Sequence, residues 1–309
     1  MSITVGKSVA RVDAFDKVTG RTKYYEDRMP AGALYIRIKH AEIAHGFVKS
    51  VDTAAAEAID GVVKVLTCFD VPDIPFPTAG HPWSMDPGHQ DVADRHLLNR
   101  HVRYYGDDVA VVIAENEVAA MQGVRALKVE YEELPFVLDV QKAMEPDAPQ
   151  IHENYPGNIL KHTDIRKGDY AAAIQEPGLI KVEGWYDTPT VQHCHIENHG
   201  CYAYEENGRM VVVSSTQIPH IIRRIVGQAL GRPWADIEVI KPISAAASAT
   251  SRMPCTSLCA PGALPRWGDA ASAWTAPGRR PSSPTASATP SGFISFPGSG
   301  RTGSWPPGR

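Results

Sequence analysis

Apolar and polar positions along residues 33–67 predict strands separated by a short helix. The stretch "ALYIRIKH" (33–40) alternates large residues, and "GVVKVLT" (61–67) is rich in β-branched residues, so both favour strands. Between them, "DTAAAEAI" (52–59) begins with Asp52, which is a good N-cap, and continues with strong helix formers. The order strand, helix, strand predicts short helices laid against a sheet.

The same order repeats over residues 107–135. "DDVAVVIA" (107–114) is typical of a buried strand, and "NEVAAMQGVRAL" (116–127) is typical of a helix capped by Asn116. "KVEYEELP" (128–135) alternates like a strand and ends at a proline. A long loop with many proline and glycine residues (71–89) separates the two repeats, and such loops often carry function. We expect residues 1–145 to form one α/β domain.

A polar stretch marked by proline and glycine, residues 146–164, is expected to link this domain to a second one. In the second domain, "ENG" (206–208) predicts a hairpin turn between two strands. "IPHIIRRIVGQALG" (218–231) has apolar residues at helical spacing and ends in a glycine, which predicts an amphipathic helix. "DIEVIKP" (236–242) then begins another strand, so residues 165–242 are expected to start a domain of mixed helices and strands.

The composition changes abruptly after Pro242. Residues 243–309 contain no Lys, Glu, Val, Tyr, His, Asn or Gln, and they hold ten of the 25 prolines. Six arginines and one acid, Asp269, give this tail a charge of +5; since the whole chain carries −4, residues 1–242 carry −9. A segment of this kind lacks the apolar mass that would offset chain entropy, so we expect it to be disordered.

Other bulk properties exclude several classes of protein. No apolar run approaches the ~20 residues of a membrane helix, and the N-terminus shows no signal peptide. The five cysteines form no CxxC pair and no disulfide framework, so we expect a reduced, cytoplasmic chain without an iron–sulfur cluster of its own. Basic and aromatic residues alternate in "DRHLLNRHVRYYGDD" (94–108), but in an acidic body this pattern favours a partner-facing segment over nucleic-acid binding.

One histidine-rich phrase is a candidate metal site. "HCHIENH" places His193, His195, Glu197 and His199 two residues apart, so all four would project from one face of an extended strand. Such a set can bind a first-row metal. The same side chains can instead form a polar strand face beside a ligand cavity or an interface. Because no second ligand cluster accompanies them, we assign no metal ligand.

A second candidate is Gln217, at the predicted strand-to-helix turn in "SSTQIPH" (214–220). Its amide can donate and accept hydrogen bonds toward a group bound near the helix start, where backbone N–H groups also point. The alternative is that Gln217 is only a helix cap or a solvated residue. Residues 1–242 contain no GxGxxG, P-loop or GxSxG phrase.

Long phrases of the chain resemble the molybdenum-binding subunit of the xanthine dehydrogenase and aldehyde oxidase family. "RVDAFDKVTGRTKYYED" (11–27) and "AEIAHG" (41–46) are similar to the opening of the family's α/β-hammerhead domain. Residues 100–135 are similar to the second half of that domain. Residues 191–231 are similar to the start of the first molybdopterin-binding domain, and the resemblance extends over residues 5–242.

The resemblance implies an α+β fold: an α/β-hammerhead domain followed by an incomplete molybdopterin-binding domain. It also implies an oxidoreductase that hydroxylates a purine or aldehyde carbon with a molybdopterin-type molybdenum cofactor. Electrons would leave to a [2Fe–2S] subunit and an FAD subunit, neither group being carried by this chain. In the family, the glutamine of the "STQ" phrase approaches an oxo ligand of molybdenum, which implies a cofactor-binding role for Gln217.

The tail departs from the family where a glycine-rich "GGGFG" phrase should follow "IEVIKP". The chain instead has "ISAAASATS" from Ile243. In a shifted reading frame, the alanine codons of this stretch permit glycines, and the codons of Met253 and Pro254 together force an alanine. A later stretch permits a second family-like phrase. We interpret residues 243–309 as out-of-frame sequence.

This interpretation limits what the chain can do. The family's catalytic glutamate, its substrate-clamping arginine and most cofactor contacts would lie beyond residue 242, so we expect no catalytic residue, no retained cofactor and no turnover. The strand at 237–240 should leave an apolar sheet edge open to self-association, which predicts poor solubility. Two other functions stay open: a non-catalytic module that docks partner subunits, and a metal enzyme built on the histidine-rich strand.

Overall fold

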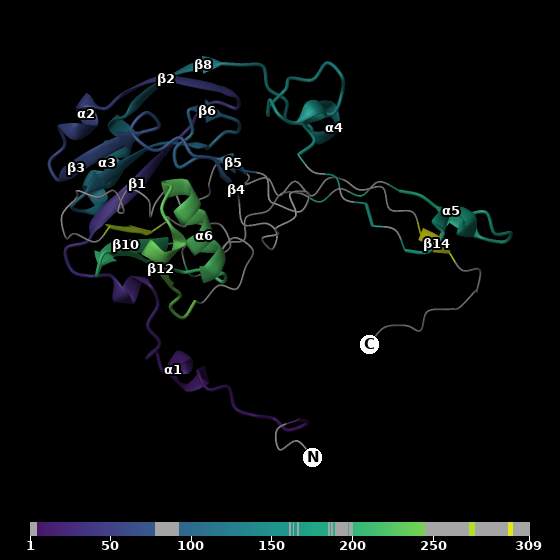
Figure 1. Cartoon of the computed structure of the whole chain (residues 1–309), viewed down its shortest axis with the longest axis horizontal. Coiled ribbons are helices and arrows are strands. Elements are labelled where there is room, and N and C mark those ends of the chain that lie inside the picture. Colours follow the sequence, from purple (N-terminus) through teal and green to yellow (C-terminus); the bar gives the residue numbers. More distant parts are fainter. Residues whose placement is uncertain are drawn as a thin grey trace. The chain divides into compact units, whose positions relative to one another are not determined.

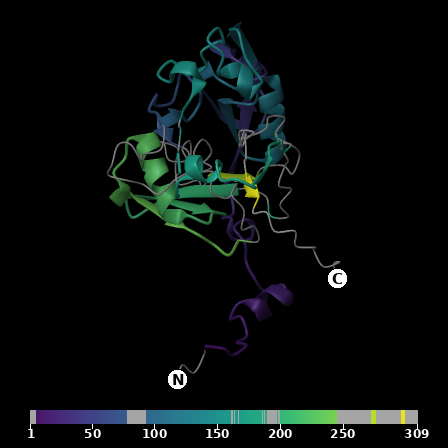
Figure 2. The same ribbon diagram turned by 90° about the vertical axis from the view of Figure 1, so that its right-hand side faces the viewer.

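The structure of the chain is a computed structural model, drawn in Figure 1 and, turned by 90°, in Figure 2. The chain divides into two compact units, residues 1–135 with 193–280 and residues 136–192 with 281–309. The described residues are 5–77, 93–160, 197, 200–244, most positions from 162 to 188, and the short strands at 272–275 and 296–298.

Strand β7 (Asp108–Ala114) is the central strand of the N-terminal half of the first unit. It pairs antiparallel with β1 (Leu34–His40) on one side and with β3 (Val62–Thr67) on the other. Every residue from 109 to 114 is buried, as its continuous apolar run predicts. The three predicted strands are confirmed to within one residue of their expected starts.

Helix α3 (Glu117–Ala126) packs on this sheet. Asn116 caps it, as predicted, because its side chain accepts a hydrogen bond from the backbone N–H of Ala119 at 2.9 Å. At Gly123 the helix lies so close to the sheet that a Cβ would come within 2.7 Å of Val112 Cγ1. The predicted helix after Asp52 is shorter than expected, since α2 covers only Ala54–Glu57.

A second sheet in this half has the strand order β6 (His101–Val102), β2 (Gly46–Asp52), β8 (Lys128–Glu133). The sequence predicts β8 but no strand at β2. Strand β2 pairs antiparallel with β8, and a Cβ on Gly46 would come within 2.2 Å of the Glu132 carbonyl oxygen. This close contact between two main chains requires glycine at position 46.

A hairpin opens the C-terminal half of the first unit. β10 (Gly200–Glu206) and β11 (Arg209–Ser214) pair antiparallel. The turn between them has positive φ at Asn207 (51°) and Gly208 (75°). The hairpin predicted from "ENG" is therefore confirmed.

Helix α6 (Pro219–Leu230) follows the hairpin and buries Ile222, Ile225 and Val226 on its apolar face. It ends at Gly231, which adopts the left-handed conformation, as the amphipathic pattern and its terminal glycine predict. β12 (Ile237–Ile240) then pairs parallel with β11. Within the described residues, β12 is the edge strand of its sheet.

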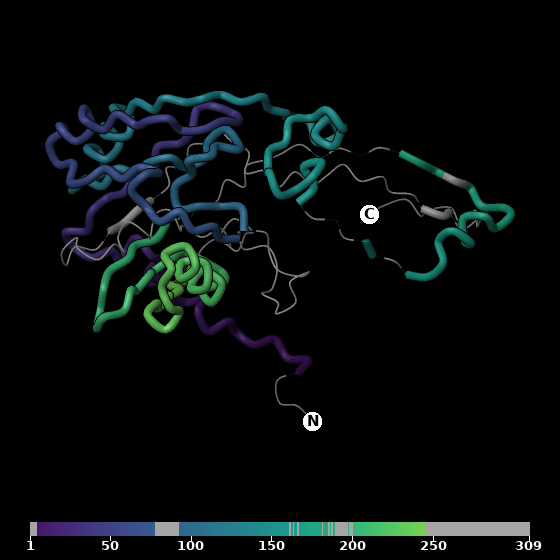
Figure 3. The backbone as a smooth tube through the Cα atoms, turned by 45° about the horizontal axis from the view of Figure 1, so that its top comes forward, coloured from purple at the N-terminus to yellow at the C-terminus, as the bar shows by residue number. Residues whose placement is uncertain are grey.

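The two halves of the first unit share one sheet and one hydrophobic core. The strand order in this sheet is β12-β11-β10-β13-β1-β7-β3. Ile36 and Val111 from the N-terminal half belong to the same buried cluster as Met210 and Val226 from the C-terminal half. Figure 3 shows residues 200–244 in green beside the purple and blue strands. The domain boundaries predicted at residues 145 and 242 stay predictions.

Two segments of the tail form strands. β13 (Ser272–Thr275) lies between β10 and β1, and β14 (Phe296–Gly298) pairs with β9 (Ile180–Val182) of the second unit. The expected disorder of residues 243–309 stays a prediction. The other residues after 244 lie outside the described part of the chain.

The second unit contains part of the predicted linker, and Asn158 organises it. The Asn158 side chain donates to the carbonyl oxygens of Ala143 and Pro149, at 2.8 and 3.0 Å, and accepts from the backbone N–H of Ile151 at 2.8 Å. Part of the linker is therefore locally ordered. Among the described residues of this unit, the helices are α4 (Val140–Ala143), η3 (Pro156–Asn158) and α5 (Tyr170–Ala173).

Several short elements complete the first unit: α1 (Ala14–Val18), η1 (Glu26–Arg28), β4 (Phe76–Pro77), β5 (Ala93–Arg95) and η4 (Trp234–Asp236). β4 and β5 pair with each other in a separate two-stranded sheet. Among the described residues, no helix is long and apolar enough to cross a membrane.

Candidate functional site

The turn that carries Gln217 lies between β11 and α6. Ser215 and Thr216 are buried, with 7% and 1% of their surface exposed, and Gln217 is half-buried. The structure therefore places Gln217 where the sequence predicts it, at a strand-to-helix turn.

Hydrogen bonds hold this turn on both sides of Gln217. The backbone N–H and the hydroxyl group of Ser215 both donate to the Gly200 carbonyl oxygen, at 3.1 and 3.2 Å. The Thr216 hydroxyl oxygen accepts from the backbone N–H of Ile218 at 3.2 Å. These bonds restrict the backbone of Gln217, so its side chain starts from a fixed point.

The N-terminal half of the first unit contacts Gly200, to which the turn is hydrogen-bonded, through Tyr25. This residue is 1% exposed, and a Cβ on Gly200 would come within 2.0 Å of its hydroxyl oxygen. The close approach of the Tyr25 ring is why position 200 must be glycine. Nearby, the Tyr202 hydroxyl donates to the Arg28 carbonyl oxygen at 3.0 Å. Residues 25–28 thus brace the strand on which the turn is anchored.

The start of α6 lies beside Gln217, but Pro219 has no N–H group and the N–H of Ile221 donates to the Ile218 carbonyl oxygen. The helix has twelve residues, and its N-cap residue, Ile218, makes no side-chain cap hydrogen bond. The N-terminus of a helix carries partial positive charge. The turn therefore combines a primary amide with a weakly positive helix end.

Helix α6 is fixed against the N-terminal half of the unit. Ile225 belongs to a buried cluster that includes Phe76 and Leu97. The Gln228 side chain donates to the Pro75 carbonyl oxygen at 3.2 Å. The position of the helix start, and of Gln217 before it, consequently depends on both halves of the unit.

The chemistry of this turn fits one part of a molybdopterin-type cofactor. A primary amide can donate to oxo and phosphate oxygens. A cofactor of that size needs several such contacts. Residues 245–271, where the resemblance implies a glycine-rich loop, lie outside the described residues.

The candidate metal strand is mostly outside the described residues, which include Glu197 but not His193, His195 or His199. Glu197 Oε2 accepts a hydrogen bond from the Ser244 hydroxyl at 2.8 Å. No group of three or more His, Cys, Asp or Glu side chains in the described part of the chain could hold a metal ion.

Two cysteines fall in the described residues, and they differ in state. Cys68 is buried and free, and burial raises the pKa of its thiol to about 11. Cys201, which is buried on β10, is disulfide-bonded. This bond departs from the expectation of a fully reduced chain.

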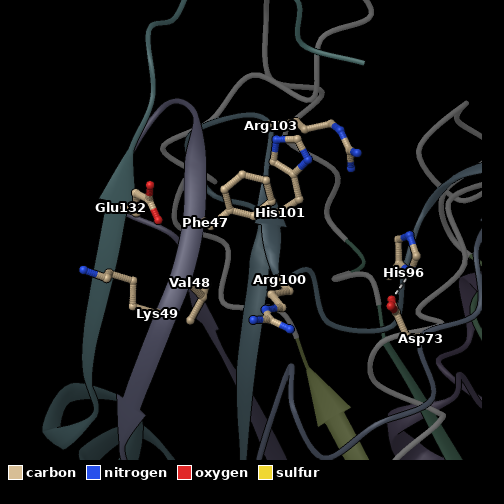
Figure 4. A pocket seen from close by; sticks show the side chains of 9 residues that line it. All are labelled: Phe47, Val48, Lys49, Asp73, His96, Arg100, His101, Arg103 and Glu132. Carbon is tan, nitrogen blue, oxygen red and sulfur yellow. Dashed lines mark ion pairs between the residues drawn. The ribbon is translucent and has the colours of Figure 1, made fainter. Parts of the chain in front are cut away.

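A groove of about 600 Å³ lies beside β6, on the N-terminal half of the first unit (Figure 4). Figure 4 shows the Phe47 and His101 rings at its centre, with Arg100 and Arg103 on either side of His101 along the chain. We call it the β6 groove, and its nine lining residues are Phe47, Val48, Lys49, Asp73, His96, Arg100, His101, Arg103 and Glu132.

Stacking and hydrogen bonds fix the ring at the centre of the β6 groove. His101 stacks on Phe47 with 4.3 Å between ring centroids. His45 Nδ1 lies 2.7 Å from the Pro135 carbonyl oxygen and must donate to it, because a carbonyl oxygen only accepts. His45 Nε2 lies 3.0 Å from His101 Nε2, and one of these two nitrogens donates a hydrogen bond to the other. No local pattern in the sequence indicates this groove, because its central rings come from segments more than 50 residues apart.

A buried carboxyl group organises the loop before β7. Asp107 is 4% exposed, and its Oδ1 accepts from Asn99 Nδ2 at 2.6 Å and from the Asp108 backbone N–H at 3.2 Å. Burial, and after it the charge of Asp108, raise the pKa of Asp107 to about 7. Sequence reasoning missed Asp107, since two adjacent aspartates look alike until folding buries one of them.

Two family models match the sequence. Residues 19–135 match "Aldehyde oxidase and xanthine dehydrogenase, a/b hammerhead domain", and residues 151–244 match "Molybdopterin cofactor-binding domain". The xanthine dehydrogenase molybdenum-binding subunit of Escherichia coli O157:H7 is 45% identical over 232 residues, which cover 75% of this chain and 30% of the relative. The nicotinate dehydrogenase large molybdopterin subunit of Eubacterium barkeri is 32% identical over 238 residues, covering 77% and 53%.

A solved structure gives the same picture. The aldehyde oxidoreductase from Desulfovibrio desulfuricans ATCC 27774 superimposes with a TM-score of 0.76 and 27% identity, over 88% of this chain and 30% of that one. The chain thus spans about a third of the length of the Escherichia coli subunit and of the Desulfovibrio desulfuricans enzyme. It belongs to the aldehyde oxidase and xanthine dehydrogenase family, of which residues 19–244 carry the hammerhead domain and part of the molybdopterin cofactor-binding domain.

Proposed function

We propose that this chain is part of the molybdenum-binding subunit of a xanthine dehydrogenase-type hydroxylase, and that the Gln217 turn is one contact of its cofactor site. The observation that supports this proposal is the anchoring of the turn by Ser215 and Thr216 at the start of α6. When bound, the molybdenum cofactor would supply the oxidation of a purine or aldehyde carbon with oxygen from water. Gln217 would orient that cofactor by donating a hydrogen bond to an oxo oxygen.

The hammerhead domain would hold this contact in place. Tyr25 braces Gly200, on which the turn is anchored, and Gln228 fixes α6 to the chain before β4. A shift of either half would move the Gln217 amide relative to a bound group. Productive geometry depends on placement to within about 0.5 Å. The shared core of the two halves would therefore keep the Gln217 amide in position.

The proposed partners are a [2Fe–2S] subunit and an FAD subunit of one cytoplasmic complex. The similarity to a xanthine dehydrogenase molybdenum-binding subunit supports separate chains for the other redox groups. No iron–sulfur or flavin group is proposed for this chain.

The chain as written is proposed to retain no cofactor and to catalyse no turnover. Residues 243–309 have a composition unlike that of residues 1–242, and the shifted reading frame accounts for this change. The missing contacts would be those of the glycine-rich loop, because only glycines let a backbone approach the cofactor closely.

Metal content tests this proposal. The chain as written would be expressed beside a version in which a one-base correction after codon 242 restores the alternative frame, together with the remaining length of the subunit. We expect molybdenum, and dye reduction driven by xanthine or an aldehyde, only in the corrected protein. Stoichiometric molybdenum with turnover in the chain as written would contradict the proposal.

The role of Gln217 is tested in the corrected protein. Gln217→Ala should lower turnover by about tenfold or more, because a donor to the cofactor is lost. Gln122→Ala, at an exposed position of α3, serves as the matched control and should leave turnover unchanged. Equal activity of the two variants would remove Gln217 from the site.

A second candidate function is non-catalytic docking of the partner subunits. The formation of a continuous core from residues 36–237 favours it, since a folded surface does not require the cofactor. Co-purification of the chain as written with tagged iron–sulfur and flavin subunits tests this function, and no retention of either subunit would count against it.

A further inference from the structure

We propose that the β6 groove binds an acidic segment of a partner polypeptide through its carboxylate groups. The groove presents Lys49, Arg100 and Arg103, and the paired rings of Phe47 and His101 lie between them (Figure 4). This inference goes beyond the proposed function, because it requires neither the cofactor nor turnover.

The charge of the groove is opposite to that of its surroundings. Residues 1–242 carry −9, whereas the described residues that line the groove include three cations, Lys49, Arg100 and Arg103, and two carboxylates, Asp73 and Glu132. Figure 4 shows Glu132 and Lys49 at one end of the groove, Asp73 and His96 at the other, and Arg100 and Arg103 between them. Asp73 is also paired with His96 at 2.7 Å. A locally positive groove attracts negatively charged groups of a ligand.

The centre of the groove is preorganised for binding. His101 is held by its stack on Phe47 and by the hydrogen bond to His45. The Arg100 guanidinium lies over the Phe69 ring, 5.2 Å from its centroid, which restricts its motion. Arginine beside aromatic rings is typical of contact surfaces between proteins.

The chemistry of the groove favours a polypeptide over a small molecule. Small-molecule sites are mostly apolar and bury most of the ligand. Here Lys49, Asp73, Arg100 and Glu132 are exposed and line an open surface. The chain's own tail is a poor occupant, because it carries +5 and the groove is itself positive. The occupant is therefore an acidic segment of another chain.

A peptide-binding experiment tests the proposal on the full chain. The probe is a fluorescent peptide of eight glutamates and two phenylalanines, and its fluorescence anisotropy reports binding. We expect binding that weakens as salt is raised, and a loss of about tenfold in affinity for the variant Arg100→Gln/Arg103→Gln. Arg125→Gln, at an exposed position of α3, removes an equal charge outside the groove and should change affinity less than twofold.

Two further measurements keep the outcome clear. A peptide with glutamine in place of every glutamate should not bind the unaltered chain, a result that does not depend on how any variant folds. Glutarate at the same carboxylate concentration should fail to displace the probe. Equal binding of the two peptides, equal affinity of the groove and Arg125 variants, or full displacement by glutarate would each overturn the proposal.

Discussion

Replacing Gly46 by alanine should force strands β2 and β8 apart. The new Cβ would come within 2.2 Å of the Glu132 carbonyl oxygen and within 2.8 Å of Ile43 Cδ1. The Ile43 side chain can rotate away, but the carbonyl of Glu132 belongs to the main chain of β8. Since ordinary contacts begin at about 3.4 Å, the two strands must separate by roughly 1 Å.

The cost follows from the bonds that this separation strains. His45 O accepts from the Leu134 backbone N–H at 3.0 Å, and His45 Nδ1 donates to Pro135 O at 2.7 Å. Each such hydrogen bond contributes about 1 kcal/mol, and the overpacking itself costs about 1–3 kcal/mol. We therefore expect Gly46→Ala to lower the free energy of unfolding by about 4 kcal/mol.

Urea unfolding of the full chain, followed by tryptophan fluorescence and circular dichroism, measures this change. The control is Gly208→Ala, where φ is +75° and no atom lies within 4 Å of the new Cβ. There only the backbone conformation is disfavoured, at a cost of about 1 kcal/mol. Equal losses of stability in the two variants would refute the argument from the main-chain contact.

Three further predictions concern other parts of the first unit. Asn116→Ala should lower the free energy of unfolding by about 1 kcal/mol through loss of the α3 cap, whereas Asn116→Asp should stay close to wild type in the same urea titration. Burial raises the pKa of Asp107 to about 7, so the fold favours the protonated carboxyl group. The stability that this group contributes is fully present below about pH 4 and is lost as the pH rises to 7. Across that window the free energy of unfolding of the wild type should fall, relative to Asp107→Asn, on the order of 4 kcal/mol, at about 1.4 kcal/mol per pKa unit. A difference between the two proteins that does not change with pH would contradict the raised pKa. Val239→Lys on β12 should reduce self-association of the chain in light scattering, and a wild-type monomer at all concentrations would remove the edge-strand argument.

Local sequence signals predict much of the first unit. The cap at Asn116, the turn at Asn207–Gly208 and the stop at Gly231 are confirmed because each depends on a few neighbouring residues. Strand β2 was missed because the reason for glycine at position 46 is its close contact with the main chain of β8 at Glu132, 86 positions later. Patterns within one segment do not contain such information.

The candidate site divides in the same way. Its position at the end of β11 follows from the alternation of strand and helix, and its chemistry from the amide of Gln217. The contacts that hold the site in place cannot be predicted in this way, because Tyr25 and Gly200 lie 175 positions apart and no periodicity links them. The expected glycine-rich loop was a matter of family resemblance, and the described residues stop before it.

The joint core has a consequence for anyone who wishes to exchange pieces between members of this family. A cut near residue 145 would follow the sequence boundary of the hammerhead domain but would uncover Phe76 and Leu97, which pack with Ile225. In a chimeric subunit joined there, α6 of one protein would have to pack against the hammerhead domain of another. Crossovers placed after β12 would transfer the hammerhead domain together with the β10–β11 hairpin and α6, so that the shared core stays intact.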